Sequence, residues 1–422
     1  MSHGSQNGSA QEPLTSPVGL ALAGGAPGGA IYEIGALRAL DEAIIGLDLR
    51  DCGCFVGVSA GAFLGSCLAN GLSTAQQVRA IVKHEPGEHP FVPETFFKPA
   101  VGELASRLLS TPRLLSVAVR DFVMRREKRL VDALTVLGQA VPVGIFDNDP
   151  IRDYVAKIFS IKGRTDDFNQ LKRKLTVVAT DLESGESMRF GHGGWPHVPI
   201  SKAVQASTAL PGLYPPVTIH GRNYVDGVLL KTMHASVALD AGAKLVFCIN
   251  PLVPVDTRQA EQQNLLPPRE VTRAGLPSVL SQTVRTLIHS RLRLGMRAYE
   301  TRYPDADVIL LEPPTDDFED FFSNIFSFSS RRGVVERAYE ATRKSLLQRR
   351  DELIPILERF GLGLDVDFLT DPSRDIWRGV GLPEMSRRTD GAEPSEVMIE
   401  DLHDMLDRLE SMAARIQARQ SV

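Results

Sequence analysis

The residues with the clearest chemical potential are the five from Gly57 to Gly61, which read GVSAG. They place Ser59 between two glycines, after an apolar run and before a run that favours helix. A serine hydroxyl attacks a carbonyl carbon only when a base removes its proton. A sharp turn from strand to helix exposes that hydroxyl and aims backbone N–H groups at the developing oxyanion. The pattern predicts such a turn, although an ordinary turn serine has the same local sequence.

A second stretch with chemical potential is GGAPGGA at 24–30, between a predicted strand and a predicted helix. Repeated glycines let backbone N–H groups form a concave site for an anion. A dinucleotide-binding turn would also begin in this way, but it requires an acidic residue at the end of the second strand. Ser59 stands near that point instead. The combination therefore favours an oxyanion site over a nucleotide site.

The third stretch is YVDGVLL at 224–230, in which Asp226 and Gly227 follow a predicted strand. Taken alone, an Asp-Gly pair indicates a hairpin turn. If Asp226 faces Ser59, its carboxylate is a candidate general base. The local sequence leaves both interpretations open.

In this order, the three stretches resemble the signatures of the patatin-like phospholipase family. GGAPGG resembles the family's Gly-rich oxyanion loop, GVSAG its nucleophile turn and DGV its aspartate motif. Two further stretches are similar to the family, ATDLESGE at 179–186 and ASTALPGLYPPV at 206–217. The resemblance covers roughly residues 18–255.

The resemblance implies a three-layer α/β/α fold with a mainly parallel central sheet and a helical insertion. It implies hydrolysis of lipid acyl esters by a dyad of Ser59 and Asp226, with no metal or cofactor. Gly57 and Gly61 would form the nucleophile turn. Backbone N–H groups would bind the oxyanion, and the residues of that loop are Gly24, Gly25, Ala26, Gly28 and Gly29.

Two departures from the family pattern raise an alternative. Ala26 and Gly28 stand where many relatives have a third glycine and a basic residue, and Val228 follows Asp226-Gly227 in place of glycine or alanine. A lipid-binding or scaffold protein of low activity is therefore a second hypothesis. A third is a His-dependent α/β-hydrolase esterase. His289 and His403 follow Asp226 in the sequence, as that class requires, but both fall on predicted helical faces and are better interpreted as surface residues.

The elements expected around these motifs alternate between strand and helix from residue 18 to residue 71, which predicts a parallel sheet. Later buried strands are predicted at 175–182, 244–250 and 307–313, and an amphipathic helix with Val284, Leu287, Leu292 and Met296 precedes the last of them. The expected organisation is a disordered tail (1–17), a patatin-like domain (18–255) with a helical insertion (about 84–150), an α/β extension completing the domain (256–370), and a linker with a C-terminal amphipathic helix (371–422).

Two segments suggest contacts beyond the core. The apolar and basic segment of about 100–130 is interpreted either as a peripheral membrane contact or as a helix packed on its own domain. The C-terminal helix carries an apolar seam, which consists of Met398, Leu402, Met405, Leu409, Met412 and Ile416. This C-terminal seam is interpreted either as a contact that pairs two subunits or as a surface that docks on the main domain.

The bulk properties of the 422 residues narrow the partners and the compartment. The net charge of −5 argues against nucleic acid as a partner. The polar N-terminus does not resemble a secretory signal, and no apolar run approaches the length of a membrane span. We therefore expect a cytoplasmic protein whose partner is a lipid or acyl-ester substrate. The four cysteines fit buried free thiols.

Overall fold

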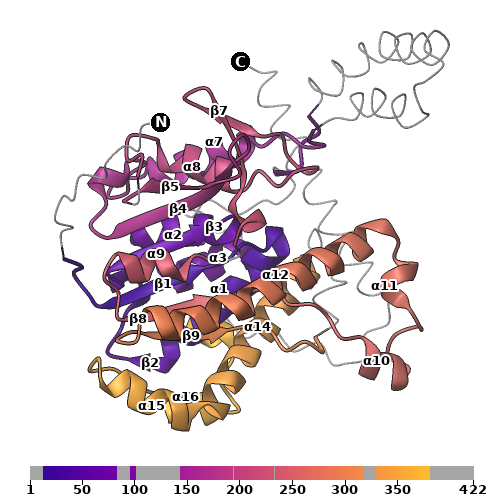
Figure 1. The fold of residues 1–422 in the computed structure, drawn as a ribbon. Coiled ribbons are helices and arrows are strands. Elements are labelled where there is room, and N and C mark those ends of the chain that lie inside the picture. The colour runs from indigo at the N-terminus through magenta and orange to yellow at the C-terminus, as the bar shows by residue number, and fades with distance from the viewer. Residues whose placement is uncertain are drawn as a thin grey trace, which may run out of the picture.

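The computed structural model describes residues 13–82, 96–100, 143–192, 194–231, 233–317 and 328–380, and its centre is the sheet seen in Figure 1. Five strands pair in parallel in the order β4-β3-β1-β8-β9. Their bounds are Val18–Leu22 (β1), Cys54–Val58 (β3), Lys174–Asp181 (β4), Leu245–Ile249 (β8) and Asp307–Leu311 (β9). Almost continuous apolar runs form these strands because helices cover both faces of a parallel sheet.

Antiparallel strands extend the sheet beyond β4. β7 pairs with β4, β6 pairs with β7, and β5 also pairs with β4. The bounds are Ser187–Gly191 (β5), Val217–Ile219 (β6) and Arg222–Asp226 (β7). Asp226 is the last residue of β7, so this edge of the sheet carries it toward the end of β3.

Two apolar cores lie on opposite faces of the sheet, because successive side chains of a strand point to opposite sides. In β1, Leu20 and Leu22 belong to one core and Ala21 to the other. In β8, Phe247 and Cys248 divide in the same way. The strand pattern thus requires a helical layer on each side.

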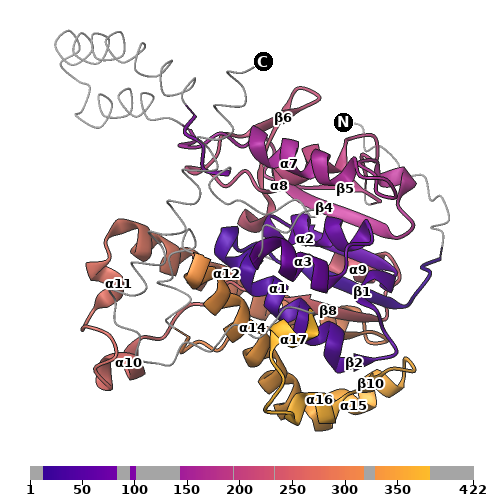
Figure 2. The same cartoon turned by 180° about the vertical axis from the view of Figure 1, so that it is seen from behind.

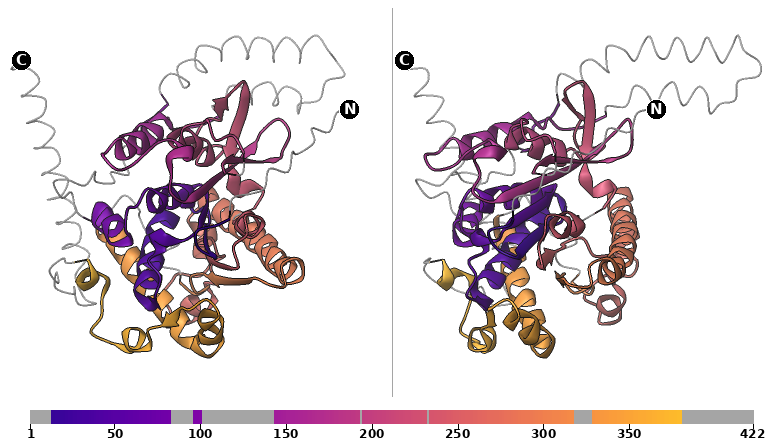
Figure 3. Two further views of the ribbon diagram at one scale, coloured as in Figure 1. Left: turned by 90° about the vertical axis from the view of Figure 1, so that its left-hand side faces the viewer. Right: turned by 60° about the vertical axis from the view of Figure 1, so that its left-hand side comes forward.

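Helices supply both layers (Figures 1 and 2). The first core is covered by α1 (Ala26–Ala43), α2 (Ala60–Ala69), α3 (Thr74–Val82), α7 (Asp149–Phe159) and α8 (Ile200–Ser207), with α14 (Phe328–Gln348) against α1. The second is covered by α9 (Ala235–Asp240) and α12 (Leu276–Arg302). Figure 3 shows the sheet between these layers.

Shorter elements complete the described chain. They are β2 (Ile44–Ile45) paired with β10 (Gly363–Leu364), the helices α10 (Arg258–Gln262), α11 (Glu270–Arg273), α15 (Arg350–Glu358), α16 (Val366–Thr370) and α17 (Ile376–Gly379), and the 3₁₀ turns η1 (Leu49–Asp51), η2 (Phe168–Gln170) and η3 (Gly227–Leu229). None of the helices within the described ranges combines the length and the apolar character needed to cross a membrane.

The mainly parallel α/β fold predicted from the sequence is confirmed, and three details differ. α1 already begins at Ala26, because Pro27 suits the first turn of a helix. On α12, Leu292 is buried but Leu287 is 61% exposed, so the apolar residues predicted for one face divide between two. Residues 371–380, expected in the linker, join the packed body through the buried Trp377.

Several predicted features fall outside the described residues. They include the N-terminal tail through residue 12, most of the helical insertion with the membrane-contact segment, and the C-terminal seam.

Candidate active site

Ser59 occupies the turn between β3 and α2 in a backbone conformation that few side chains adopt. Its φ is 52° and its ψ is −120°. The Ser59 N–H donates to the Ser207 hydroxyl oxygen at 2.8 Å, and that hydroxyl donates to the Val178 carbonyl at 2.6 Å. Surrounding contacts therefore hold the strained turn, as is common for functional residues.

The two glycines of GVSAG are required by close packing around this turn. A Cβ on Gly57 would lie 2.4 Å from the Gly61 carbonyl oxygen, and one on Gly61 would lie 2.5 Å from the carbonyl carbon of Leu22. The Gly61 N–H also donates to the Ala23 carbonyl at 3.1 Å. The glycines thus let α2 start directly against β1 and β3.

Asp226 is positioned by backbone contacts at the end of β7. Its N–H donates to the Ala209 carbonyl at 3.0 Å, and its carbonyl accepts from the Thr180 hydroxyl at 3.1 Å. Its carboxylate oxygen Oδ1 accepts from the Val228 N–H at 2.9 Å. The side chain is thereby fixed toward the β3–α2 turn.

Ser59 and Asp226 meet although 166 residues separate them in the chain. The Ser59 hydroxyl donates a hydrogen bond to the Asp226 carboxylate. Asp226 is 2% exposed, and burial raises its pKa to about 7, against the lowering effect of the Val228 N–H and the Ser59 hydroxyl. A carboxylate with this pKa can accept a proton near neutral pH and return it.

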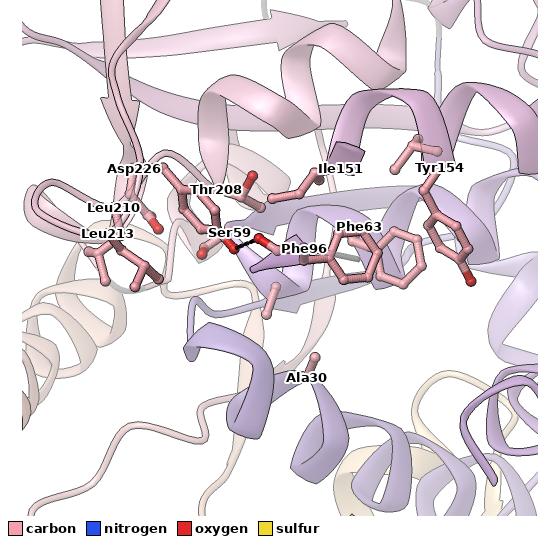
Figure 4. A pocket seen from close by; sticks show the side chains of 13 residues that line it. Ala30, Ser59, Phe63, Phe96, Ile151, Tyr154, Thr208, Leu210, Leu213 and Asp226 are labelled. Atoms are coloured by element: carbon pink, nitrogen blue, oxygen red, sulfur yellow. Dashed lines mark hydrogen bonds between the residues drawn. The ribbon is translucent and has the colours of Figure 1, made fainter. Parts of the chain in front are cut away.

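Both side chains face one largely apolar pocket of about 630 Å³ including its open mouth (Figure 4). Its wall contains a ring cluster in which Tyr154 lies 6.0 Å from Phe63 and 5.3 Å from Phe96, measured between ring centroids. The Tyr214 hydroxyl donates to the Phe96 carbonyl at 2.9 Å. The remaining lining residues are Ala30, Ala60, Ile151, Val155, Thr208, Leu210 and Leu213. An apolar chain fits this lining, and its polar groups are concentrated at Ser59 and Asp226.

The predicted oxyanion residues are not equivalent in the structure. Gly24 is nearest to the nucleophile, since a Cβ on it would lie 3.0 Å from the Ser59 Cβ. The Gly29 N–H is already bonded to the Gly25 carbonyl at 2.8 Å within α1. Gly28 and Gly29 line a second cavity with Pro251 and Arg285. Gly25 is the N-cap of α1 and Ala26 its first helical residue, so the N–H groups at the start of α1 are the candidate oxyanion donors of this loop.

The structure adds one candidate oxyanion donor, Ala60, that the sequence analysis did not name. Ala60 follows Ser59, lines the pocket and begins α2. The first N–H groups of a helix have no acceptor within the helix. In nucleophile turns the N–H of the residue after the nucleophile generally binds the oxyanion. This general geometry could have pointed to Ala60 from the sequence.

None of the described histidines lines this pocket. His192, His197, His220, His234 and His289 are all absent from its lining. His234 is buried at the start of α9, where burial lowers its pKa to about 3. His289 pairs with Glu312, with Nδ1 3.6 Å from Oε1. Within the described part of the chain, the titratable side chain that is hydrogen-bonded to Ser59 is the Asp226 carboxylate.

Comparison with known families agrees with this arrangement. The patatin-like phospholipase model matches residues 20–239, which include Ser59 and Asp226. The chain belongs to the patatin-like phospholipase family.

Individual relatives of this patatin-like protein are distant. An uncharacterised NTE family protein of Mycobacterium bovis is 30% identical over 102 residues, and two from Mycobacterium tuberculosis strains match equally. Each match spans 24% of this chain and 25% of the relative. Among solved structures, VipD from Legionella pneumophila has a TM-score of 0.34 at 16% identity, covering 77% of this chain and 66% of VipD. The type III effector ExoU has a TM-score of 0.32 at 14% identity, covering 80% and 54%.

The two supporting stretches of this patatin-like protein have structural roles that the sequence did not reveal. ATDLESGE places Thr180 against the Asp226 carbonyl. ASTALPGLYPPV supplies Ser207 to the Ser59 N–H and four residues to the pocket, which are Thr208, Leu210, Leu213 and Tyr214. Neither stretch contains Ser59 or Asp226, so these supporting contacts become visible only in the folded chain.

Proposed function

We propose that this protein is a lipid acyl hydrolase that works through Ser59 and Asp226. The observation that carries the proposal is the hydrogen bond from the Ser59 hydroxyl to a buried carboxylate inside an apolar pocket. Family membership supports lipid hydrolysis in general. The dyad, the oxyanion donors and the acyl-enzyme are our extension from the geometry.

In the first half-reaction, the Ser59 Oγ attacks the acyl carbonyl carbon and its proton passes to the Asp226 carboxylate. The carbonyl oxygen becomes an oxyanion, for which the N–H groups of Ala60 and of the Gly24–Gly28 segment are the proposed donors. The ester C–O bond then breaks, the alcohol leaves with the proton from Asp226, and the acyl group remains on Ser59.

In the second half-reaction, water attacks the acyl-enzyme while Asp226 accepts a proton from it. Collapse of the tetrahedral intermediate returns that proton to the Ser59 Oγ and releases the fatty acid. No histidine is required, because one carboxylate with a pKa near 7 serves both directions of transfer.

The test uses the full chain on phospholipid vesicles and on p-nitrophenyl esters. Ser59→Ala and Asp226→Asn should each lower kcat/KM at least ~10³-fold, with an unchanged thermal unfolding midpoint. A fluorophosphonate probe should label wild type at Ser59 and leave Ser59→Ala unlabelled. His289→Gln, which alters the His–carboxylate pair outside the pocket, is the matched control and should keep its activity.

The rival hypotheses give different results. Loss of activity in His289→Gln, or in another histidine variant that stays folded, would indicate a His-dependent esterase. Folded wild type that neither reacts with the probe nor hydrolyses any ester would indicate a lipid-binding or scaffold protein.

A further inference from the structure

The outward face of α12 carries an apolar stripe that no described element covers. Six aliphatic side chains on it are 37–68% exposed, and they are Leu276, Val279, Leu280, Val284, Leu287 and Leu294. We call this set the α12 outer stripe. The opposite face packs inward through Ile288 and Leu292. Figure 1 shows α12 crossing the front of the molecule. An apolar stripe of this length on a surface helix marks an interaction site.

The charge of α12 restricts what can bind there. The helix contains five arginines and a single acidic residue, Glu300, the arginines being Arg285, Arg291, Arg293, Arg297 and Arg302. All except Arg285 are exposed. The partner of the α12 outer stripe should therefore be amphipathic and acidic.

The C-terminal seam, which lies outside the described residues, has this chemistry. Between 393 and 410 the sequence has one arginine, Arg408, and seven acidic residues, which are Glu393, Glu396, Glu400, Asp401, Asp404, Asp407 and Glu410. The same segment begins the apolar seam from Met398 to Ile416. Its charge is thus opposite to that of α12.

The apolar spacings also correspond. Steps of four, seven and seven residues join Leu276, Leu280, Leu287 and Leu294, and the same steps join Met398, Leu402, Leu409 and Ile416. In a helix the 18 steps from the first to the last residue of either set rise about 27 Å at 1.5 Å per residue. On α12, the exposed residues Thr283 and Ser290 lie three positions after Leu280 and Leu287. In the seam, Met405 and Met412 occupy the corresponding positions after Leu402 and Leu409. The two stripes therefore match in length and period.

The chain is long enough to bring the stripes together. The described chain ends at Val380, whose carbonyl accepts from Arg79 on α3 at 3.1 Å. The 17 residues from 381 to 397 can extend about 56 Å. A compact chain of 422 residues has a radius of gyration of only about 22 Å. Tethering also raises the effective concentration of the segment, which allows a seam of under three heptads to bind.

We propose that the C-terminal segment from Met398 to Ile416 docks as a helix on the α12 outer stripe of the same chain. α12 adjoins the loop after Asp226, since Arg291 Nη1 donates to the Leu229 carbonyl at 3.4 Å. The docked segment would thus lie one helix away from that loop.

A distance measurement on the full chain tests the proposal without reference to hydrolysis. All four native cysteines are buried, so spin labels can be directed to Ser290→Cys and Ala413→Cys. Docking predicts a label separation under about 20 Å, because packed helices lie about 10 Å apart. The short distance should persist when labelled protein is diluted with unlabelled protein.

Matched variants separate docking from accidental proximity. Leu409→Asp should abolish the short distance while Leu409→Met keeps it, with the same thermal unfolding midpoint in both. A control pair, Lys162→Cys with Ala413→Cys, should give a long distance, because Lys162 is exposed just beyond α7, which packs on the other face of the sheet.

Three results would overturn the proposal. A short distance that disappears on dilution would assign the stripe to a second copy. No short distance in buffer, with the label at Ser290→Cys becoming shielded only when phosphatidylglycerol vesicles are added, would assign it to a lipid surface. Equal distances in Leu409→Asp and Leu409→Met would show that the seam does not bind the stripe.

Discussion

At the scale of single residues, Ser59 combines a reactive position with an unfavourable backbone. A serine at φ 52° and ψ −120° stores strain of about 1–3 kcal/mol. The bond from its N–H to Ser207, together with the close packing at Gly57 and Gly61, keeps the turn in place. The strained turn therefore lowers the stability of the fold but orients the Ser59 hydroxyl outward.

This strain predicts that two substitutions that both remove the hydroxyl give proteins of different stability. Ser59→Gly should have a free energy of unfolding about 1 kcal/mol higher than Ser59→Ala, because glycine adopts positive φ without a Cβ penalty. Urea unfolding of the two variants, with equal m values, measures the difference. Equal stability, or a more stable alanine variant, would show that the turn is not strained.

The Asp226 carboxylate predicts the pH dependence of the reaction. Burial raises its pKa to about 7, and a general base must be deprotonated to accept the serine proton. Below that pKa the fraction of active carboxylate falls tenfold per pH unit, so kcat/KM should rise through pH 7 and level above it. A profile on a soluble short-chain ester from about pH 5 to 9 tests this, and a flat profile would remove Asp226 from the role of base.

At the scale of elements, α7 and the ring cluster form one wall of the pocket. Ile151, Tyr154 and Val155 of α7 face Ser59 across it, and Tyr154 also contacts the rings of Phe63 and Phe96. If Ser59 attacks an acyl carbonyl as proposed, this wall would limit how far the acyl chain can extend from it.

Removing the Tyr154 ring should shift the preference of the enzyme toward longer acyl chains. In Tyr154→Ala, the ratio of kcat/KM for the palmitate over the butyrate p-nitrophenyl ester should rise about tenfold, since each added methylene that is buried contributes up to a few kcal/mol. Tyr154→Phe keeps the ring and serves as the control. An unchanged ratio in a folded Tyr154→Ala protein would place the acyl chain elsewhere.

The elements also show what a sequence can and cannot predict here. The β3–α2 turn was predictable because Gly57, Ser59 and Gly61 satisfy requirements that are local. The position of Asp226 at a strand end was predictable, but its approach to Ser59 depends on β7 pairing antiparallel with β4, which no local pattern specifies. Ser207 has no local signature, because its role exists only when α8 packs beside β3 and β4.

At the scale of the whole molecule, the body is built on two cores, and α1 is enclosed on two sides in the first. It lies between the sheet and α14, and a Cβ on Gly35 would meet the Val335 carbonyl of α14 at 2.4 Å. Glu33 of α1 is therefore fully buried. A carboxyl group in this position affects the stability of the entire fold.

Burial raises the pKa of Glu33 well above its usual value, with the Ala23 backbone acting in the opposite direction. The folded protein thus binds a proton that the unfolded chain releases above its ordinary pKa. Folding stability should fall as pH rises beyond that value, by at most about 1.4 kcal/mol per pH unit.

Glu33→Gln keeps the size of the side chain and loses this dependence. Its free energy of unfolding should exceed that of wild type by more at pH near 8 than near 5. Exposed Glu300→Gln, the control, should follow wild type at both values. If Glu33→Gln and wild type instead keep a constant difference across this range, Glu33 is ionised in the fold and a charge partner must compensate for its burial.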